Sequence, residues 1–295
     1  MLAVLSAIRL AERFDRELVL IWQKSSACSC SWPTLFATEF EHADFKKLSI
    51  PPERRVKIDA SDVLHRGRSP YLDLGAIDGD VFVSSNCIFT FPADPLRGEG
   101  FWVYEPILAE LSSCFQKLKL NPYVADELEK IQTQVAGRKT LGIHIRRGTM
   151  DNEGHQAVFG RITDEAYVKL ARKLVEKEGF ECLFVASDSS ESDARIAADT
   201  GEQVVRHPKR SYAKDSEEEA IQDALVDFMG LAHANHILGN NRSTFCYLAS
   251  IFRLIPYTAI LEPKPLQIPF TTHYYLANDG SFAHRAEAST LSLES

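Results

Sequence analysis

The sequence predicts an α/β protein whose C-terminal half forms a doubly wound parallel sheet. Two observations support this fold class. From residue 140 onward, five short apolar runs rich in β-branched residues alternate with segments in which apolar residues recur every three or four positions. Each intervening segment is long enough for a helical crossover between parallel strands. Strands and helices that alternate in this way form a sheet covered by helices on both faces.

The elements of this half follow in order along the chain. We expect strands at 141–145, 182–187, 203–207, 236–239 and 257–261. The helices between them are expected at 163–179, 190–200, 216–234 and 243–252. Ser190 and Asp193 have capping-box spacing, which predicts that the second of these helices begins there.

The N-terminal half is less regular. Its apolar spacing predicts helices at 2–14, 105–118 and 121–135, and strands at 17–22 and within 80–91. Asn121 and Pro122 are a typical helix start. We expect a loop at 26–36 and polar, exposed chain at 51–70, and we place the boundary between the halves at 136–140.

Composition and charge exclude several classes of protein. The net charge of −8 and the pI of about 5.6 argue against a nucleic-acid partner. No apolar run approaches the roughly 20 residues of a membrane span, and the N-terminus lacks the basic region of a signal peptide. The six cysteines form no convincing metal-ligand pattern and are interpreted as free thiols of a reducing compartment, with a single disulfide as the alternative. We therefore predict a cytoplasmic protein without a metal site.

Polar residues follow the predicted strands of the C-terminal half. Arg146 and Arg147 end the first strand, and Asp188 follows the second. The fourth strand is followed by Asn240, and Ser243 and Thr244 open the next helix. Ligands of open parallel sheets bind at the carboxyl ends of the strands. Arginines and helical N–H groups suit a pyrophosphate, so this edge predicts a nucleotide-diphosphate site.

Each of these residues also has a structural interpretation. Paired arginines at a strand end can form salt bridges, and Ser243 can be a simple helix cap. Asp227 lies among apolar neighbours and is either functional or part of a buried ion pair. His144 alternates with isoleucines on a buried strand, which favours a core histidine, and His207 is interpreted as incidental. P-loop and dinucleotide-binding motifs are absent from the sequence.

Four segments resemble one enzyme family. They are "GIHIRRGTMD" (142–151), "LFVASDSSE" (183–191), "EAIQDALVDFMGLAHANHILGNNRSTFCYLASIF" (219–252) and "MLAVLSAIRLAERFDRELVLIW" (1–22). Together they are similar to the α1,6- and α1,2-fucosyltransferases and the bacterial nodulation fucosyltransferase, which are related to the protein O-fucosyltransferases. The likeness covers roughly residues 1–36 and 140–261.

The resemblance implies a GT-B fold with two Rossmann-like domains. Residues 1–136 would form the acceptor-side domain, 137–263 the GDP-sugar-binding domain and 264–295 a partly flexible tail. The implied reaction is inverting transfer of fucose from GDP-fucose to a glycan or glycoconjugate, with no metal and no cofactor beyond the donor. The implied partners are therefore a nucleotide sugar and a glycan acceptor.

The resemblance also implies roles for single residues. Arg146 would grip the diphosphate and neutralise the charge that develops on it, with Arg147 beside it. Ser243 and Thr244 would contact phosphate, and Asp188 and Asp227 would lie near guanosine. The remaining expected substrate-binding residues are His144, Asp151 and Asn240.

The sequence departs from the family pattern in three places. The motif aspartate is displaced, since Thr149 stands at its position and Asp151 follows. Gln156 replaces a candidate catalytic glutamate, which leaves Glu153 or His155 as the expected general base. The glycine-rich loop that precedes the first helix in the family is not in this sequence, through either a late assigned start or a loss. Two alternatives therefore remain: a catalytically impaired nucleotide- or glycan-binding relative, and a transferase for a different nucleotide sugar.

Overall fold

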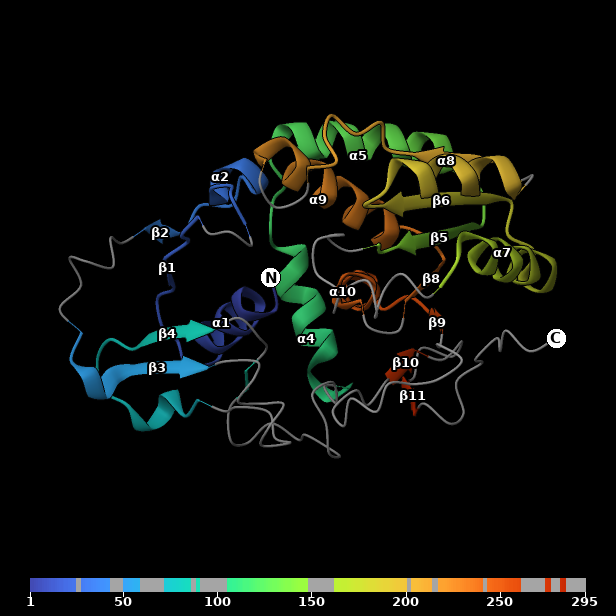
Figure 1. Cartoon of the computed structure of the whole chain (residues 1–295). Coiled ribbons are helices and arrows are strands. Elements are labelled where there is room, and N and C mark those ends of the chain that lie inside the picture. The colour runs from blue at the N-terminus through green and yellow to red at the C-terminus, as the bar shows by residue number, and fades with distance from the viewer. Residues whose placement is uncertain are drawn as a thin grey trace. The chain divides into compact units, whose positions relative to one another are not determined.

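The computed structural model contains two compact units (Figure 1). One contains Met1–Gln23 and Thr38–Lys119, and the other contains Lys24–Ala37 and Leu120–Gln267. The residues that the structure describes are 1–24, 28–42, 50–58, 72–85, 89–90, 105–147, 162–200, 203–213, 217–240, 243–260, 274–276 and 282–284.

A five-stranded parallel sheet forms the centre of the second unit, which confirms the predicted α/β class (Figure 1). The strand order is β7-β6-β5-β8-β9, and every neighbouring pair is parallel. The strands are β5 (Thr140–Ile145), β6 (Cys182–Ser187), β7 (Val204–Arg206), β8 (His236–Asn240) and β9 (Tyr257–Ile260). All five lie within one or two residues of the predicted ranges.

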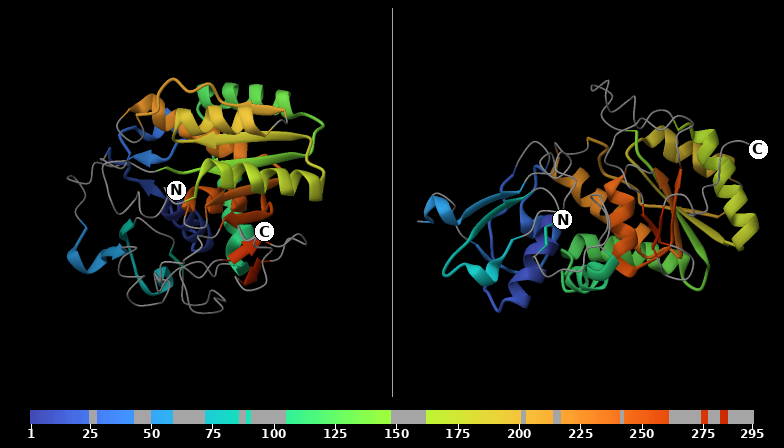
Figure 2. Two further views of the ribbon diagram at one scale, coloured as in Figure 1. Left: turned by 45° about the vertical axis from the view of Figure 1, so that its right-hand side comes forward. Right: turned by 90° about the horizontal axis from the view of Figure 1, so that it is seen from below.

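Helices cover both faces of this sheet (Figure 2). They are α5 (Pro122–Val135), α7 (Asp164–Glu178), α8 (Ser190–Asp199), α9 (Glu218–Ala232) and α10 (Thr244–Arg253). The odd-numbered side chains of β5 pack with α7 and α8 in one buried cluster. The even-numbered positions face α9 and α10, where Gly142 lies so close to Leu231 that a Cβ atom would come within 3.0 Å of that side chain. Because successive side chains point to opposite faces, each strand contributes to the buried core on both sides of the sheet.

Local capping explains where several helices begin and end. The Thr163 hydroxyl accepts a hydrogen bond from the Ala166 amide at 3.3 Å and caps α7, which ends at Gly179 with a positive φ of 68°. Asn121 caps α5 by accepting from the Tyr123 amide at 3.0 Å. The predicted capping box at Ser190 is wrong, because Ser189 is the residue that caps α8.

The chain reverses its winding direction between β5 and β8. From β5 it proceeds through α7 and α8 to β6 and β7 on one side, and α9 then returns it to β8 on the other side. This arrangement is a topological switch point, at which ligands of open α/β sheets bind beyond the carboxyl ends of the strands.

The described part of the first unit contains two α-helices and two small parallel sheets. Its elements are α1 (Leu2–Arg13), β1 (Val19–Leu20), β2 (Glu41–His42), η2 (Pro52–Arg54), β3 (Arg55–Ile58), η3 (Leu74–Ala76), β4 (Phe82–Ser85) and α4 (Glu105–Gln116). Helices α1 and α4 are joined by the buried Arg9, whose Nε lies 2.6 Å from the Glu110 carboxylate. In the described part of this unit, β1 pairs with β2 and β3 with β4, so a Rossmann-like sheet here stays a prediction.

Four features differ from the expected elements. The loop predicted at 26–36 contains the short helix α2 (Trp32–Leu35), and the chain expected to be polar and exposed at 51–70 contains β3. Beyond the expected elements lie three further strands, β2, β10 (Tyr274–Leu276) and β11 (Phe282–His284). Helix α5 belongs to the second unit, whereas the boundary expected at 136 places it in the N-terminal half. No helix among the described residues is long and apolar enough to cross a bilayer.

Candidate functional site

Arg146 and Asp188 form an ion pair at the carboxyl ends of β5 and β6. The Arg146 Nη1 lies 3.2 Å from the Asp188 Oδ2, and the other carboxylate oxygen accepts a hydrogen bond from the Arg147 amide at 2.7 Å. The Arg146 side chain remains 36% exposed, whereas Asp188 is 11% exposed. Asp188 therefore holds the two strand ends together and leaves much of the Arg146 guanidinium accessible to solvent.

Arg147 has a different environment from its neighbour. Its Nε donates to the Ser192 hydroxyl at 3.0 Å, its Nη1 donates to the Ile162 carbonyl at 2.5 Å, and its Nη2 pairs with Asp164. The guanidinium also lies over the Tyr167 ring, 5.7 Å from the centroid. Arg147 therefore links β5 to the N-termini of α7 and α8. Its expected role in substrate binding is not tested by these contacts, but most of its donors already have protein partners.

Lys209 joins the end of β6 to Asp227 on α9. The ammonium lies 2.5 Å from the Asp227 Oδ2 and also donates to the Ser187 carbonyl. Both side chains are buried, at 7% and 5% exposure. Of the two interpretations offered for Asp227, the buried ion pair is therefore present. Its Oδ1 nevertheless has no hydrogen-bond partner among the described residues, so the ion pair leaves one acceptor unused.

Burial raises the pKa of Asp227 to about 6, even though Lys209 opposes the shift. The carboxyl group is thus mostly ionised at neutral pH but titrates well above the ordinary range of aspartate.

His144 connects β5 to the start of α10. It is buried, stacks on Phe245 with ring centroids 4.8 Å apart, and its Nδ1 lies 2.9 Å from the Cys246 Sγ and 3.4 Å from the Ser243 hydroxyl. Burial lowers the pKa of His144 to about 3, with Arg146 acting in the same direction. The imidazole is therefore neutral at physiological pH and packs as a core residue, as its alternation with isoleucines indicated.

The N-terminus of α10 lies directly after β8. The Asn240 carbonyl accepts hydrogen bonds from the Ser243 amide at 3.1 Å and from the Tyr257 hydroxyl at 2.5 Å, which fixes the turn between strand and helix. Ser243 is the N-cap residue but makes no capping hydrogen bond, and Thr244 begins the helix. Ser243 therefore leaves the first-turn N–H groups of α10 without a side-chain cap among the described residues.

Several expected site residues cannot be compared with the structure. Asp151, Glu153 and His155 lie outside the described residues, as do Thr149 and Gln156. Only the backbone position of Thr244 is described. The candidate general bases therefore stay predictions.

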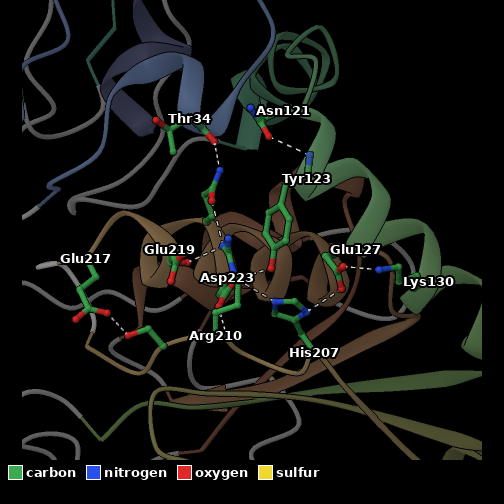
Figure 3. Close-up of polar contacts among 12 residues, drawn as sticks. Thr34, Asn121, Tyr123, Glu127, Lys130, His207, Arg210, Glu217, Glu219 and Asp223 are labelled. Atoms are coloured by element: carbon green, nitrogen blue, oxygen red, sulfur yellow. Dashed lines mark hydrogen bonds and ion pairs between the residues drawn. The ribbon is translucent and has the colours of Figure 1, made fainter.

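A second group of charged residues lies between α5 and α9, and we call it the α5–α9 cluster (Figure 3). Its members are Tyr123, Glu127, His207, Arg210 and Asp223. The fully buried Asp223 accepts from the Tyr123 hydroxyl at 2.8 Å and from the Arg210 amide at 2.6 Å, and its Oδ1 lies 3.2 Å from the His207 Nε2. The guanidinium of Arg210 stacks on the Tyr123 ring at 3.7 Å. The interpretation of His207 as incidental was therefore wrong, because it is a buried member of a structural network.

Burial opposes the ionisation of Asp223, but the contact with His207 and the hydrogen bonds from Arg210 and Tyr123 outweigh it and hold the pKa of this carboxyl below its ordinary value. Next to the cluster, Arg206 lines a surface pocket of about 290 Å³ together with Lys130. Arg206, the last residue of β7, thus lies beside α5.

Sequence reasoning missed Lys209, the buried cation closest to Asp227. It follows β7 in the run Pro208-Lys209-Arg210, so its position beyond a strand end was the available signal. Sequence alone could not choose among the cations of this run, since only tertiary packing places Lys209 against β6 and α9. No group of three or more metal-ligating side chains occurs within the described part of the chain.

The fold is that of solved fucosyltransferases. The α1,6-fucosyltransferase NodZ soaked with GDP-fucose is 16% identical, with a TM-score of 0.56, over 87% of this chain and 89% of that chain. NodZ co-crystallised with GDP is 14% identical, with a TM-score of 0.55, over 88% and 91% of the two chains. NodZ from Bradyrhizobium gives 14% identity and a TM-score of 0.55 over 87% and 89%. No protein-family model and no curated protein matches the sequence.

These comparisons confirm the predicted resemblance at the level of the fold. At 13–16% identity, the likeness to the NodZ structures defines how the chain is arranged and leaves donor, acceptor and activity to be argued from its own residues.

Proposed function

We propose that this protein is an inverting glycosyltransferase that transfers fucose from GDP-fucose to a glycan or glycoconjugate. One observation carries the proposal: Arg146 and the N-terminus of α10 flank the switch point between β5 and β8. A guanidinium on one side of this point and helical N–H groups, which carry partial positive charge, on the other suit a diphosphate. The fold is shared with NodZ fucosyltransferases solved with GDP and with GDP-fucose.

In this proposal Arg146 acts on the leaving group. As the glycosidic bond breaks, negative charge grows on GDP, and a preorganised guanidinium lowers the energy of that transition state. Asp188 holds Arg146 in place through their 3.2 Å contact. Because the guanidinium and the helical N–H groups supply the positive potential, the proposal requires neither a metal ion nor a cofactor besides the donor.

We assign recognition of the guanine base to Asp227 in preference to Asp188. Guanine presents its N1–H and N2–H₂ groups as donors, which an ionised carboxylate accepts. Both oxygens of Asp188 contact arginine groups, whereas Asp227 keeps one oxygen without a protein partner among the described residues.

The acceptor hydroxyl must lose its proton as its oxygen attacks the anomeric carbon and GDP leaves from the opposite face. Glu153 and His155 are our candidates for the general base, on the basis of the sequence alone. We retain a cytoplasmic location as part of the proposal, supported by the free thiols of Cys114, Cys182 and Cys246.

Calorimetric titration with GDP, UDP and ADP tests the donor base. We expect GDP to bind at least about tenfold more tightly than the other two, because their bases present different donor patterns to Asp227. Equal affinities would contradict a guanosine-specific site.

The Arg146→Ala variant tests the diphosphate role. Loss of a charge-assisted contact costs about 2 kcal/mol, so GDP affinity should fall about 30-fold. Arg195→Ala is the matched control, since this exposed arginine on α8 pairs with Glu165 and Asp199, away from the strand ends. If Arg146→Ala binds GDP as tightly as Arg195→Ala does, the assignment is wrong.

A further inference from the structure

Lys209 occupies a central position in the buried polar region beside the proposed nucleotide site. Its ammonium contacts the Asp227 carboxylate at 2.5 Å, donates to the Ser187 carbonyl at the end of β6, and lies 5.1 Å from the centre of the Tyr212 ring. One buried cation thus connects the sheet edge to α9.

The charges around Asp227 come from two parts of the chain. Lys209 and His207 approach from the segment between β7 and α9, and Asp193 approaches from α8. Asp193 is buried at 3% exposure and accepts from the Tyr212 hydroxyl at 2.9 Å, and its Oδ1 has no hydrogen-bond partner in the described residues. Two buried carboxylates therefore share Lys209 as the nearest buried cation.

Burial raises the pKa of both carboxyl groups, and Lys209 acts against the rise in each case. Two neighbouring carboxylates in a low-dielectric region cannot both ionise readily without a cation between them. Removing the ammonium would leave the pair without this compensation and favour the protonated form of Asp227.

The protonation state of Asp227 matters for the role proposed above. An ionised carboxylate accepts hydrogen bonds through both oxygens, whereas a protonated one carries a donor that opposes an incoming N–H group. The unused Oδ1 is an acceptor for a base N–H as long as Asp227 is ionised and its other oxygen is held in place.

We infer that Lys209 is a positioning residue that keeps Asp227 ionised and fixed as the acceptor for a guanine base, and thereby sets the acid limit of GDP binding. The inference rests on the proposed function. Lys209 acts through Asp227 and needs no contact with the nucleotide.

The first test compares GDP affinity across pH in the parent and in Lys209→Met. In the parent, affinity should be constant above about pH 7 and fall as Asp227 is protonated near pH 6. In the variant the fall should begin at higher pH, so that binding at pH 7 is about tenfold weaker if the midpoint rises by about two units. An unchanged midpoint would overturn the inference.

Two further variants separate the charge of Lys209 from its packing. Lys209→Arg keeps the cation, so it should return the parent's pH profile even if absolute affinity is lower. Lys139→Met is the matched control, because this lysine packs over Phe180 at the amino end of the same sheet. If GDP binding by Lys209→Arg shows the same pH profile as Lys209→Met, the positive charge of residue 209 does not determine that profile.

A double-mutant cycle tests whether Lys209 acts through Asp227. In an Asp227→Asn background, Lys209→Met should change GDP affinity by less than about twofold. The double variant also removes both buried charges together, so it is expected to fold if Lys209→Met alone does not. If Lys209→Met lowers GDP affinity as much in the Asp227→Asn background as in the parent, Lys209 does not act through Asp227.

The titration of Asp227 can be followed by carbon-detected NMR without any nucleotide. Failure of the parent to bind GDP, with a titration midpoint that still moves in Lys209→Met, would refute the proposed function but not the electrostatic coupling. GDP binding by the parent, with a midpoint that does not move, would refute the inference alone.

Discussion

The α5–α9 cluster and the carboxyl ends of β5 and β6 contain the same kinds of charged residue but differ in how completely these are paired. In the cluster, the buried Asp223 receives hydrogen bonds from the side chains of Tyr123 and Arg210 and from the Arg210 amide, and its Oδ1 lies 3.2 Å from the His207 Nε2. Arg146, at the end of β5, is partly exposed. Asp227, on α9 and linked to the end of β6 by Lys209, has one oxygen without a hydrogen-bond partner among the described residues. Residue type is therefore a poor guide to role, whereas the number of hydrogen bonds that each carboxylate makes within the protein distinguishes Asp223 from Asp227.

The pKa shifts of the two aspartates lie in opposite directions and express the same contrast. Hydrogen bonds hold the pKa of Asp223 below its ordinary value against the effect of burial, whereas burial raises that of Asp227 to about 6. Asp223 therefore stabilises the fold in its ionised form, and the ionised form of Asp227 costs stability. A carboxylate that costs stability is expected where function requires it.

The largest change in the free energy of unfolding should come from removing the Asp223 carboxylate from the α5–α9 cluster. Asp223→Ala leaves the buried His207 and the partly exposed Arg210 without their shared partner, so we expect the free energy of unfolding to fall by about 3 kcal/mol in urea titrations. Asp199→Ala, at an exposed position on α8, should change it by less than about 0.5 kcal/mol. The contribution of Asp223 should be present above about pH 4 and be lost as pH falls further. If Asp223→Ala lowers the free energy of unfolding by no more than Asp199→Ala does, the cluster does not stabilise the fold.

The second-largest change in the free energy of unfolding should come from the titration of Asp227 with pH. The pKa of Asp227 rises from 3.8 to about 6 on folding, so its contribution is complete below about pH 4 and is lost as pH rises through 6. The change amounts to about 3 kcal/mol. Between pH 4.5 and pH 7, urea unfolding should show about 2 kcal/mol of this decline in the parent but not in Asp227→Asn. Parallel profiles for the two proteins would mean that Asp227 does not titrate in this range.

The smallest effect on stability should separate the two adjacent arginines. Arg147→Ala loses its contacts to Ser192, Ile162 and Asp164, so thermal or urea unfolding should show a loss of about 2 kcal/mol. Arg146→Ala should cost less than about 0.5 kcal/mol, because its pair with Asp188 is partly solvated. Similar losses would contradict the division between a structural and a ligand-facing arginine.

The regular half of the chain could be predicted closely from its sequence. Strands such as 141–145 and 182–187 are apolar on both faces and bounded by helical periodicity, which is the pattern of a buried parallel sheet. In the N-terminal half, β3 has an exposed or half-buried pattern over most of its length, and α2 has only four residues. Short elements with mixed burial carry too few residues for a periodic signal.

The candidate site was predicted in part. Arg146, Asp188, Asp227 and Ser243 could be selected because each follows a predicted strand or lies in a segment that resembles the fucosyltransferases. Lys209 could not, since its pairing with Asp227 depends on how the segment after β7 packs on α9. The role of His207 was missed for the same reason.

The sequence by itself determined the alternation of strands and helices and the residues that end each strand, because hydrophobic periodicity and capping are local properties of the chain. The tertiary structure alone decided the strand order β7-β6-β5-β8-β9, which puts the switch point between β5 and β8. It also decided which of two adjacent arginines is used in packing and which remains partly exposed. Strand order and ion pairing depend on contacts between residues far apart in the sequence, and no local pattern encodes them.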